Sequence, residues 1–105
     1  MTKSEQNKGI SEEFVNETIK ELCHLIIQSN DEAFLNDFFT CLFTKPELKD
    51  IANRWLLVKE IDSGTTQREI AKNFSMSLCK ITRGSKELNK PDSAFRKMLE
   101  MLKNE

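Results

Sequence analysis

Hydrophobic residues recur at helical spacing along the chain and are interrupted by short polar breaks. The first repeat follows Ser11, which predicts a helix that this side chain caps and that runs to about Ser29. Asn30 and Asp31 end that helix, and a Phe-rich helix follows. Its apolar side chains cover about half of the helix circumference, a wider face than a surface helix usually shows. They are Phe34, Leu35, Phe38, Phe39, Leu42 and Phe43.

The width of this face predicts a homodimer with an extensive, intertwined core. A single chain of 105 residues has little other surface with which to cover so broad an apolar face. A deep core within one chain is the alternative interpretation.

A third helix is predicted to begin at a capping box formed by Thr44 and Glu47 and to end at Gly64. Its apolar positions are Ile51, Trp55, Val58 and Ile61. The helical wheel also places Arg54 on this apolar side. The arginine either lays its stem on apolar surface and extends its head to water, or it meets a partner that needs a positive charge.

The segment QREIAKNFSMSLCKITRGSKEL predicts a helix-turn-helix at about residues 66–88. A second capping box, Thr66 and Glu69, opens its first helix, which is expected to run from Gln67 to about Asn73. Ser75 occupies the turn position where glycine is commonest, so a left-handed residue there carries modest strain. Packing between the helices is assigned to Ile70, Ala71, Phe74, Met76 and Ile81.

Positive charge is concentrated in this segment, although the whole chain has a net charge of only −1. Residues 1–64 carry 7 basic and 12 acidic side chains, whereas residues 65–90 carry 6 and 2. A localised basic patch is typical of a surface that binds phosphates. A charged helical hairpin without a nucleic-acid partner is the alternative.

The second helix of the motif has two sides of different character. Leu78, Ile81, Ser85 and Leu88 share one side and are expected to face inward. The opposite arc can face DNA and carries hydroxyl, small and cationic groups suited to base edges, namely Cys79, Lys80, Thr82, Arg83 and Lys86. Phosphate contacts are assigned to the preceding helix, at Gln67, Arg68 and Lys72.

Other classes of protein are not favoured. Cys23, Cys41 and Cys79 are widely spaced, and His24 is the only histidine, so we expect no disulfide framework, no metal site and no enzyme. No apolar run approaches the roughly 20 residues that span a bilayer, which favours a cytoplasmic protein. Residues 1–10 are expected to form a flexible arm, and residues 11–105 one domain.

The helix-turn-helix segment resembles the tryptophan-operon repressors. ITRGS is the most specific part of the likeness, which continues through LFTKPE and IANRWLLVKEI and covers roughly residues 15–103. The resemblance implies an all-α chain of about six helices, interlocked as a homodimer. It also implies that L-tryptophan binds as corepressor and that the occupied dimer binds operator DNA.

The resemblance also implies residues of the effector site. Two arginines of the family sandwich the indole ring, and Arg54 and Arg83 stand at the matching positions. Arg83 would also engage the ligand carboxylate. Thr44, Val58 and Gly84 match further pocket positions, Gly84 because a side chain there would obstruct the ligand.

The amino group of the ligand has its own implied contacts. The backbone carbonyls of Cys41 and Phe43 fall where the family holds this group. Glu87 stands in place of a serine close to it. The Glu87 carboxylate either pairs with Arg83 on the helix surface or accepts a hydrogen bond from the ligand's amino group.

The resemblance places Gln67, Arg68, Leu78, Cys79, Lys80 and Thr82 at DNA-contact positions. Ser77 replaces a turn glycine of the family and joins this set with Lys72, Arg83 and Lys86. Because Leu78, Cys79 and Lys80 differ from the family residues, a different operator sequence is expected. Two alternatives stay open: a repressor that answers to another small effector, and a dimeric interaction module that uses its basic face for an acidic protein.

Overall fold

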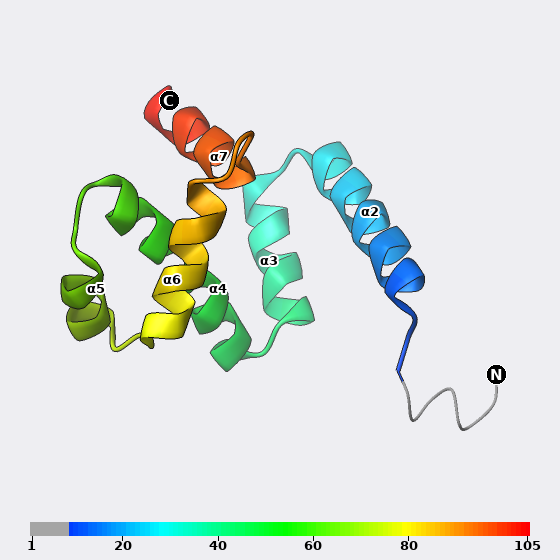
Figure 1. The fold of residues 1–105 in the computed structure, drawn as a ribbon. Coiled ribbons are helices and arrows are strands. Elements are labelled where there is room, and N and C mark those ends of the chain that lie inside the picture. Colours follow the sequence, from blue (N-terminus) through cyan, green and yellow to red (C-terminus); the bar gives the residue numbers. More distant parts are fainter. Residues whose placement is uncertain (1–8) are drawn as a thin grey trace. The chain divides into compact units, whose positions relative to one another are not determined.

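A computed structural model describes residues 9–105 and contains six helices and no strand in that range (Figure 1). The chain forms two compact units, one that ends at Leu42 and one that spans Phe43–Glu105. The predicted all-α class is confirmed. Residues 1–8 of the predicted N-terminal arm lie outside the described residues, and residues 9–10 have no regular secondary structure.

The first unit is a helical pair, α2 (Glu12–Ser29) and α3 (Glu32–Leu42), that pack against each other. The Ser11 hydroxyl accepts a hydrogen bond from the backbone N–H of Phe14 at 3.1 Å, which confirms the predicted cap. The break at Asn30 is also confirmed, with a left-handed φ of 44°. No residue of α2 or α3 is buried, so this pair has no core of its own.

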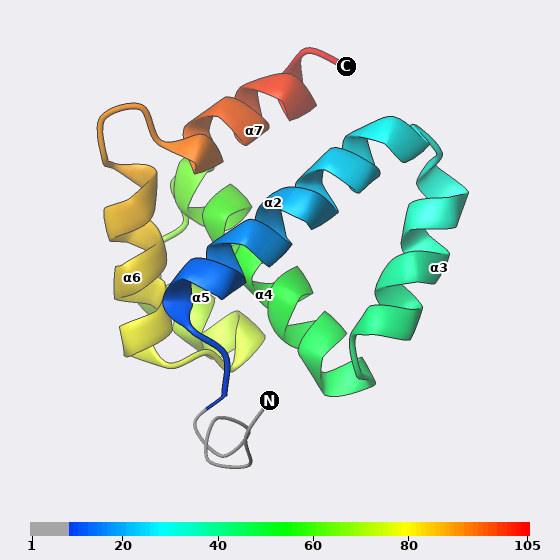
Figure 2. The same ribbon diagram turned by 90° about the vertical axis from the view of Figure 1, so that its right-hand side faces the viewer.

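The second unit contains α4 (Lys45–Asp62), α5 (Gln67–Phe74), α6 (Leu78–Leu88) and α7 (Ala94–Lys103). α6 lies across α4, and both pack against α5, while α7 packs on α6 (Figures 1 and 2). Both predicted capping boxes form, at the starts of α4 and α5. The two short helices α5 and α6 are therefore held on α4, which is the longest helix of this unit.

Two neighbouring residues of α4 serve two separate hydrophobic clusters. Leu57 packs with Ile70 and Ile81, and the partly buried Ile61, Ala71, Phe74 and Met76 surround them. Val58 packs with Leu88 and Leu99, which fastens α4 to the end of α6 and to α7. The predicted packing inside the α5–α6 segment is confirmed.

The predicted apolar face of α4 is confirmed in part, because Trp55 and Ile61 pack against the cluster of Val58. Of its four positions only Val58 is buried, Ile51 is exposed, and the buried Leu57 was not included. The reason is that α5 and α6 pack on the Leu57 side of the helix.

Leu78 was also assigned the wrong side. It is 62% exposed, whereas Ile81 and Leu88 of the same predicted face are buried. Leu78 is the first residue of α6 and precedes the first buried position of that helix, Ile81, by one turn. The surrounding helices do not cover it there.

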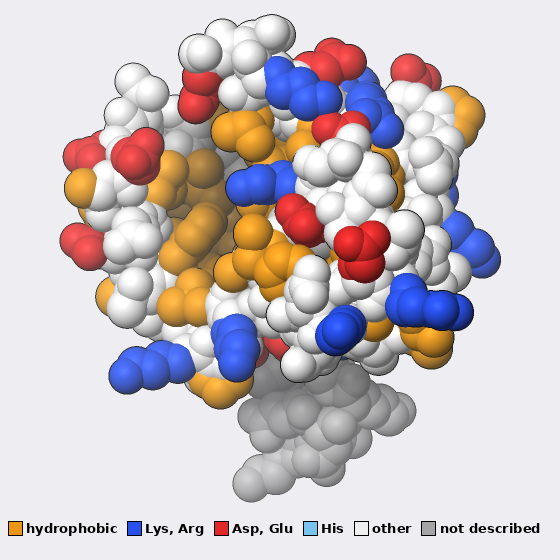
Figure 3. All heavy atoms as spheres, turned by 90° about the vertical axis from the view of Figure 1, so that its left-hand side faces the viewer, with side chains coloured by type: hydrophobic (Ala, Val, Ile, Leu, Met, Phe, Trp, Pro, Cys, Tyr) orange, Lys and Arg blue, Asp and Glu red, His pale blue; other side chains and the backbone are white. Residues whose placement is uncertain are grey.

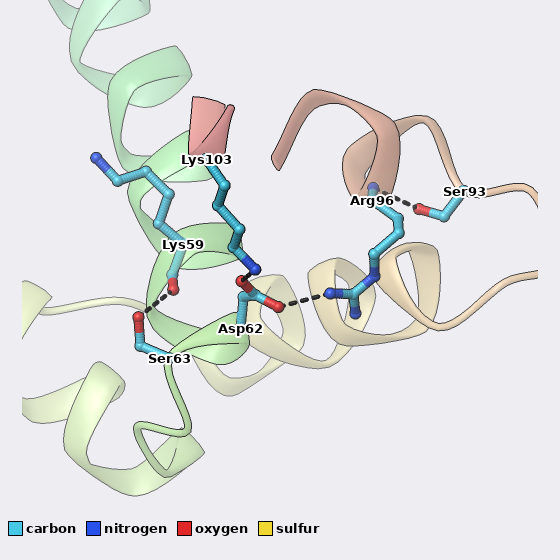
Figure 4. A network of polar contacts seen from close by, with 6 residues as sticks. All are labelled: Lys59, Asp62, Ser63, Ser93, Arg96 and Lys103. Atoms are coloured by element: carbon cyan, nitrogen blue, oxygen red, sulfur yellow. Dashed lines mark hydrogen bonds and ion pairs between the residues drawn. The ribbon is translucent and has the colours of Figure 1, made fainter. Parts of the chain in front are cut away.

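An acidic residue at the end of α4 holds α7 in place (Figure 4). The carboxylate of Asp62 accepts hydrogen bonds from Lys103 Nζ, at 2.8 Å, and from Arg96 Nη1. Its side chain is only 14% exposed. The contact with Lys103 and then that with Arg96 lower the pKa of Asp62 below its ordinary value. One carboxylate thus contacts both ends of α7.

The turn between α5 and α6 allows a test of backbone strain. Ser75 is left-handed there, with a φ of 52°. Ser75→Gly should raise the free energy of unfolding by roughly 0.5–1 kcal/mol, because the strain of about 1–2 kcal/mol that a Cβ causes exceeds the entropy cost of glycine. Urea unfolding measures the change. Asn30→Gly is the control. It should raise the free energy of unfolding by less, because asparagine tolerates a left-handed backbone, here with a φ of 44°, better than serine does. Equal gains would contradict the assignment of strain to Ser75.

Asp62 predicts a pH dependence of stability. Because its pKa is lower in the folded protein than in the unfolded chain, its contribution is present above pH about 4 and is lost as the pH falls below that value. Asp62→Asn should therefore lower the Tm at neutral pH and flatten the fall in Tm on acidification. Circular dichroism at a series of pH values measures both effects. Glu100→Gln is the control on α7, and a Tm profile of Asp62→Asn parallel to wild type would contradict the prediction.

Candidate functional site

A pocket of about 240 Å³ lies between α4 and α6. Arg54, Val58, Arg83 and Gly84, four of the predicted effector residues, line it together. The other lining residues are Leu57, Lys80 and Phe95. Arg54, Leu57 and Val58 share one side of α4, and Lys80, Arg83 and Gly84 share one side of α6, because both sets have i, i+3, i+4 spacing. Two facing helical stripes therefore build this pocket.

Gly84 determines how closely the two helices approach. It is buried, and a Cβ built on it would lie 2.8 Å from Cδ2 and 3.4 Å from Cγ of Leu57. The sequence predicted that this glycine keeps space for a ligand. The structure adds a second reason, because a Cβ here would force the Leu57 side chain to shift.

The pocket combines an apolar lining with positive charge. Leu57, Val58 and Phe95 supply the apolar surface, while the cations are Arg54, Lys80 and Arg83. None of the residues that line the pocket is acidic. A flat apolar group that carries a carboxylate suits this lining, because guanidinium groups both stack on aromatic rings and bind carboxylates.

The hydroxyl and the backbone N–H of Thr44 form the hydrogen bonds that cap α4. Its hydroxyl donates to Glu47 Oε1 at 3.0 Å and accepts from the backbone N–H of Glu47 at 3.3 Å. Its own backbone N–H also donates to Glu47 Oε1, at 2.8 Å, and this bond, followed by that of the hydroxyl, lowers the pKa of Glu47. Thr44 does not line the pocket between α4 and α6.

Three further predicted effector residues also lie outside that lining. Cys41 belongs to the first unit, near the end of α3, and Phe43 is the first residue of the second unit. The Glu87 carboxylate accepts a hydrogen bond from Lys90 Nζ at 2.9 Å, which differs from the pairing with Arg83 that was considered. The roles of Thr44, Cys41, Phe43 and Glu87 at a ligand stay predictions.

The outer side of α6 carries a shallow groove of about 510 Å³. Five of the predicted DNA-contact residues line it, namely Leu78, Cys79, Thr82, Arg83 and Lys86, together with Glu87 and Lys90. Leu78, Cys79, Thr82, Arg83 and Lys86 are exposed, as are Gln67, Arg68 and Lys72 of α5. The structure thus gathers most of the predicted contact set on α5 and the outer side of α6.

Two members of the predicted DNA-contact set lie differently. The Ser77 hydroxyl accepts from the backbone N–H of Lys80 at 3.3 Å and so caps α6. Lys80 does not line the outer groove but lines the pocket toward α4, with its Nζ 3.9 Å from Asp50 Oδ1. The assignment of both residues to DNA stays a prediction.

Neither a metal centre nor a membrane span is found in residues 9–105. This part of the chain contains no group of three or more His, Cys, Asp or Glu side chains that could hold a metal ion. None of its helices is long and apolar enough to cross a membrane.

Comparison with known proteins identifies relatives over most of the chain. The family model described as Trp repressor protein matches residues 17–103. A Trp operon repressor homolog of Chlamydia caviae is 40% identical over 83 residues, which are 78% of this chain and 79% of the relative. A protein of the same name from Chlamydia trachomatis serovar L2 is 39% identical over 70 residues, 66% of this chain and 74% of the relative.

A third protein called Trp operon repressor homolog, from Xylella fastidiosa strain M23, is 34% identical over 71 residues, 67% of this chain and 73% of the relative. No solved structure matches. The family match covers α4–α7 and most of the α2–α3 pair, and therefore includes every residue of the pocket and of the outer groove. The chain belongs to the Trp repressor protein family.

Proposed function

We propose that this protein is a DNA-binding transcriptional repressor with L-tryptophan as its corepressor. Membership of the Trp repressor family supports the repressor function. The observation that carries the rest is the position of Arg83, which lines both the pocket between α4 and α6 and the outer groove of α6. A ligand held by Arg83 in the pocket therefore acts directly on a residue of the DNA-facing surface.

The chemistry of the pocket supports an indole carboxylate as the ligand. The indole ring lies between the Arg54 and Arg83 guanidinium groups and against Val58 and Phe95. The carboxylate binds Arg83, which presents several donors in a geometry that matches two oxygens. Binding thus restrains Arg83 and the side of α6 from which it projects.

The outer surface of α5 and α6 supports binding to double-stranded DNA. In this function α6 enters the major groove, where Cys79 and Thr82 reach base edges and Leu78 offers an apolar contact to a thymine methyl group. Arg68 and Lys72 are exposed on α5 and contact phosphates. The phosphate contacts position the protein, and the contacts of α6 select the sequence.

The α2–α3 pair supports a homodimer. Apolar side chains of both helices stay exposed, among them Phe14, Ile19, Leu25, Phe34 and Leu42. An apolar hollow of about 350 Å³ lies between these helices and is lined by Leu22, Leu25, Ile26, Gln28, Ser29, Phe34, Leu35 and Phe38. The space-filling view also shows hydrophobic side chains at the surface of the single chain (Figure 3). A second copy is the partner that covers such surface in the dimer we propose.

Two arginine substitutions test this function, because one is assigned to the ligand and the other to DNA. Duplexes are first selected from a random pool with L-tryptophan present, and two half-sites related by a two-fold axis are expected. Arg54→Ala should abolish the effect of L-tryptophan on affinity for the selected duplex. Arg68→Ala should weaken binding to all duplexes and lower the slope of log affinity against log salt by about one.

Lys97→Ala is the matched control, since Lys97 is exposed on α7 and lines neither the pocket nor the groove. Arg54→Ala protein that still responds to L-tryptophan would contradict the effector site. Wild-type protein that binds all duplexes alike would contradict the repressor and favour an interaction module with a basic face.

A further inference from the structure

Lys80 lines the pocket on the α4 side of α6 and does not line the outer groove. It precedes Arg83 by three residues and Gly84 by four, and all three line the pocket against α4. The outer groove, in contrast, is lined by residues on both sides of Lys80 in sequence, Cys79 and Thr82, but not by Lys80 itself. Lys80 is therefore a third basic residue in the lining of the pocket of Arg54 and Arg83.

Asp50 holds the Lys80 ammonium group loosely. Nζ of Lys80 and Oδ1 of Asp50 are 3.9 Å apart, and both side chains are 56% exposed. An exposed ion pair at this separation contributes little to stability and exchanges readily. Asp50 precedes Arg54 by four residues, so the pair lies beside Arg54 on the same side of α4.

Lys80 also borders a second hollow, so it can reach a polar group from either side. This hollow has a volume of about 460 Å³ and shares Arg54, Leu57 and Lys80 with the first pocket. Asp50 lines the second hollow but not the first. When Lys80 leaves Asp50, its ammonium group can therefore turn toward a ligand beside Arg83.

We propose that Lys80 binds the carboxylate of the effector together with Arg83, and that Asp50 limits the affinity by competing for Lys80. This inference rests on the proposed function, because it assumes that the pocket takes an indole carboxylate. A carboxylate bound in the pocket would lie near the buried, apolar Leu57 and Val58, whereas the Asp50 side chain is 56% exposed. A charge-assisted hydrogen bond in that position is stronger than the exposed ion pair it replaces.

Calorimetric titration of the full-length variants with L-tryptophan and with tryptamine, which lacks the carboxylate, tests the proposal. Lys80→Met should weaken L-tryptophan binding by about tenfold. The same variant should bind tryptamine as well as wild type does, or more tightly, because it removes a positive charge near a cationic ligand. Lys80→Arg keeps the charge and should restore most of the affinity for L-tryptophan.

Asp50→Asn provides the second arm of the test. It frees Lys80 and should tighten L-tryptophan binding by roughly twofold to fivefold. Most of that gain should be lost when Asp50→Asn is combined with Lys80→Met, since the gain acts through Lys80. Lys97→Met is the control for the loss of one positive charge on the same unit. Circular dichroism shows whether each variant is folded.

Four results would overturn the proposal. If Lys80→Met protein binds L-tryptophan as tightly as wild type, Lys80 does not bind the carboxylate. The same conclusion follows if the substitution lowers the affinities for L-tryptophan and tryptamine equally. Unchanged L-tryptophan affinity with an altered base preference of the selected duplexes would make Lys80 a base-reading residue. Wild-type protein that binds neither L-tryptophan nor indole-3-propionate would instead overturn the proposed effector, and the role of Lys80 with it.

Discussion

The close crossing of α6 over α4 at Gly84 is the contact on which the rest of the second unit depends. With no side chain at this position, Leu57 can fill the space beneath α6 and join Ile70 and Ile81 in one cluster. The same crossing turns Arg54 and Arg83 toward one pocket, since each lies three residues or fewer from a member of the contact. The packing of α4 against α6 and the shape of the pocket thus share one constraint.

The two sides of α6 carry different sets of side chains. Its inner side adds cations to an apolar pocket, and its outer side presents small, hydroxyl and cationic groups along a shallow groove. Arg83 lines both surfaces, and the proposed function uses this shared position to connect them. α7 contributes differently: the ion pairs of Asp62 with its two ends keep Phe95 and Leu99 against α4 and α6.

Local signals in the sequence predicted local structure well. Ser11, the two Thr–Glu capping boxes and the left-handed Ser75 all act within four residues of their position, so their roles follow from spacing alone. The buried Leu57 was missed, and Leu78 was assigned to the wrong side of α6. Each depends on the direction in which another helix crosses, and a helical wheel does not contain that information.

The predicted effector residues fall into two groups, those that line the pocket and those that do not. Arg54, Val58, Arg83 and Gly84 meet because α4 and α6 cross within one unit. Cys41, Phe43, Thr44 and Glu87 are assigned to the ligand by family resemblance and do not line this pocket. Their roles at a ligand stay predictions, because spacing along one chain does not show how separate helices meet.

Calorimetric titration of L-tryptophan into the wild-type protein tests the central claim most directly. The account predicts saturable binding of one molecule per chain, with loss of binding when Arg83→Ala removes the residue shared by the pocket and the outer groove. The absence of saturable binding to a folded wild-type protein, or unchanged binding to Arg83→Ala, would contradict it.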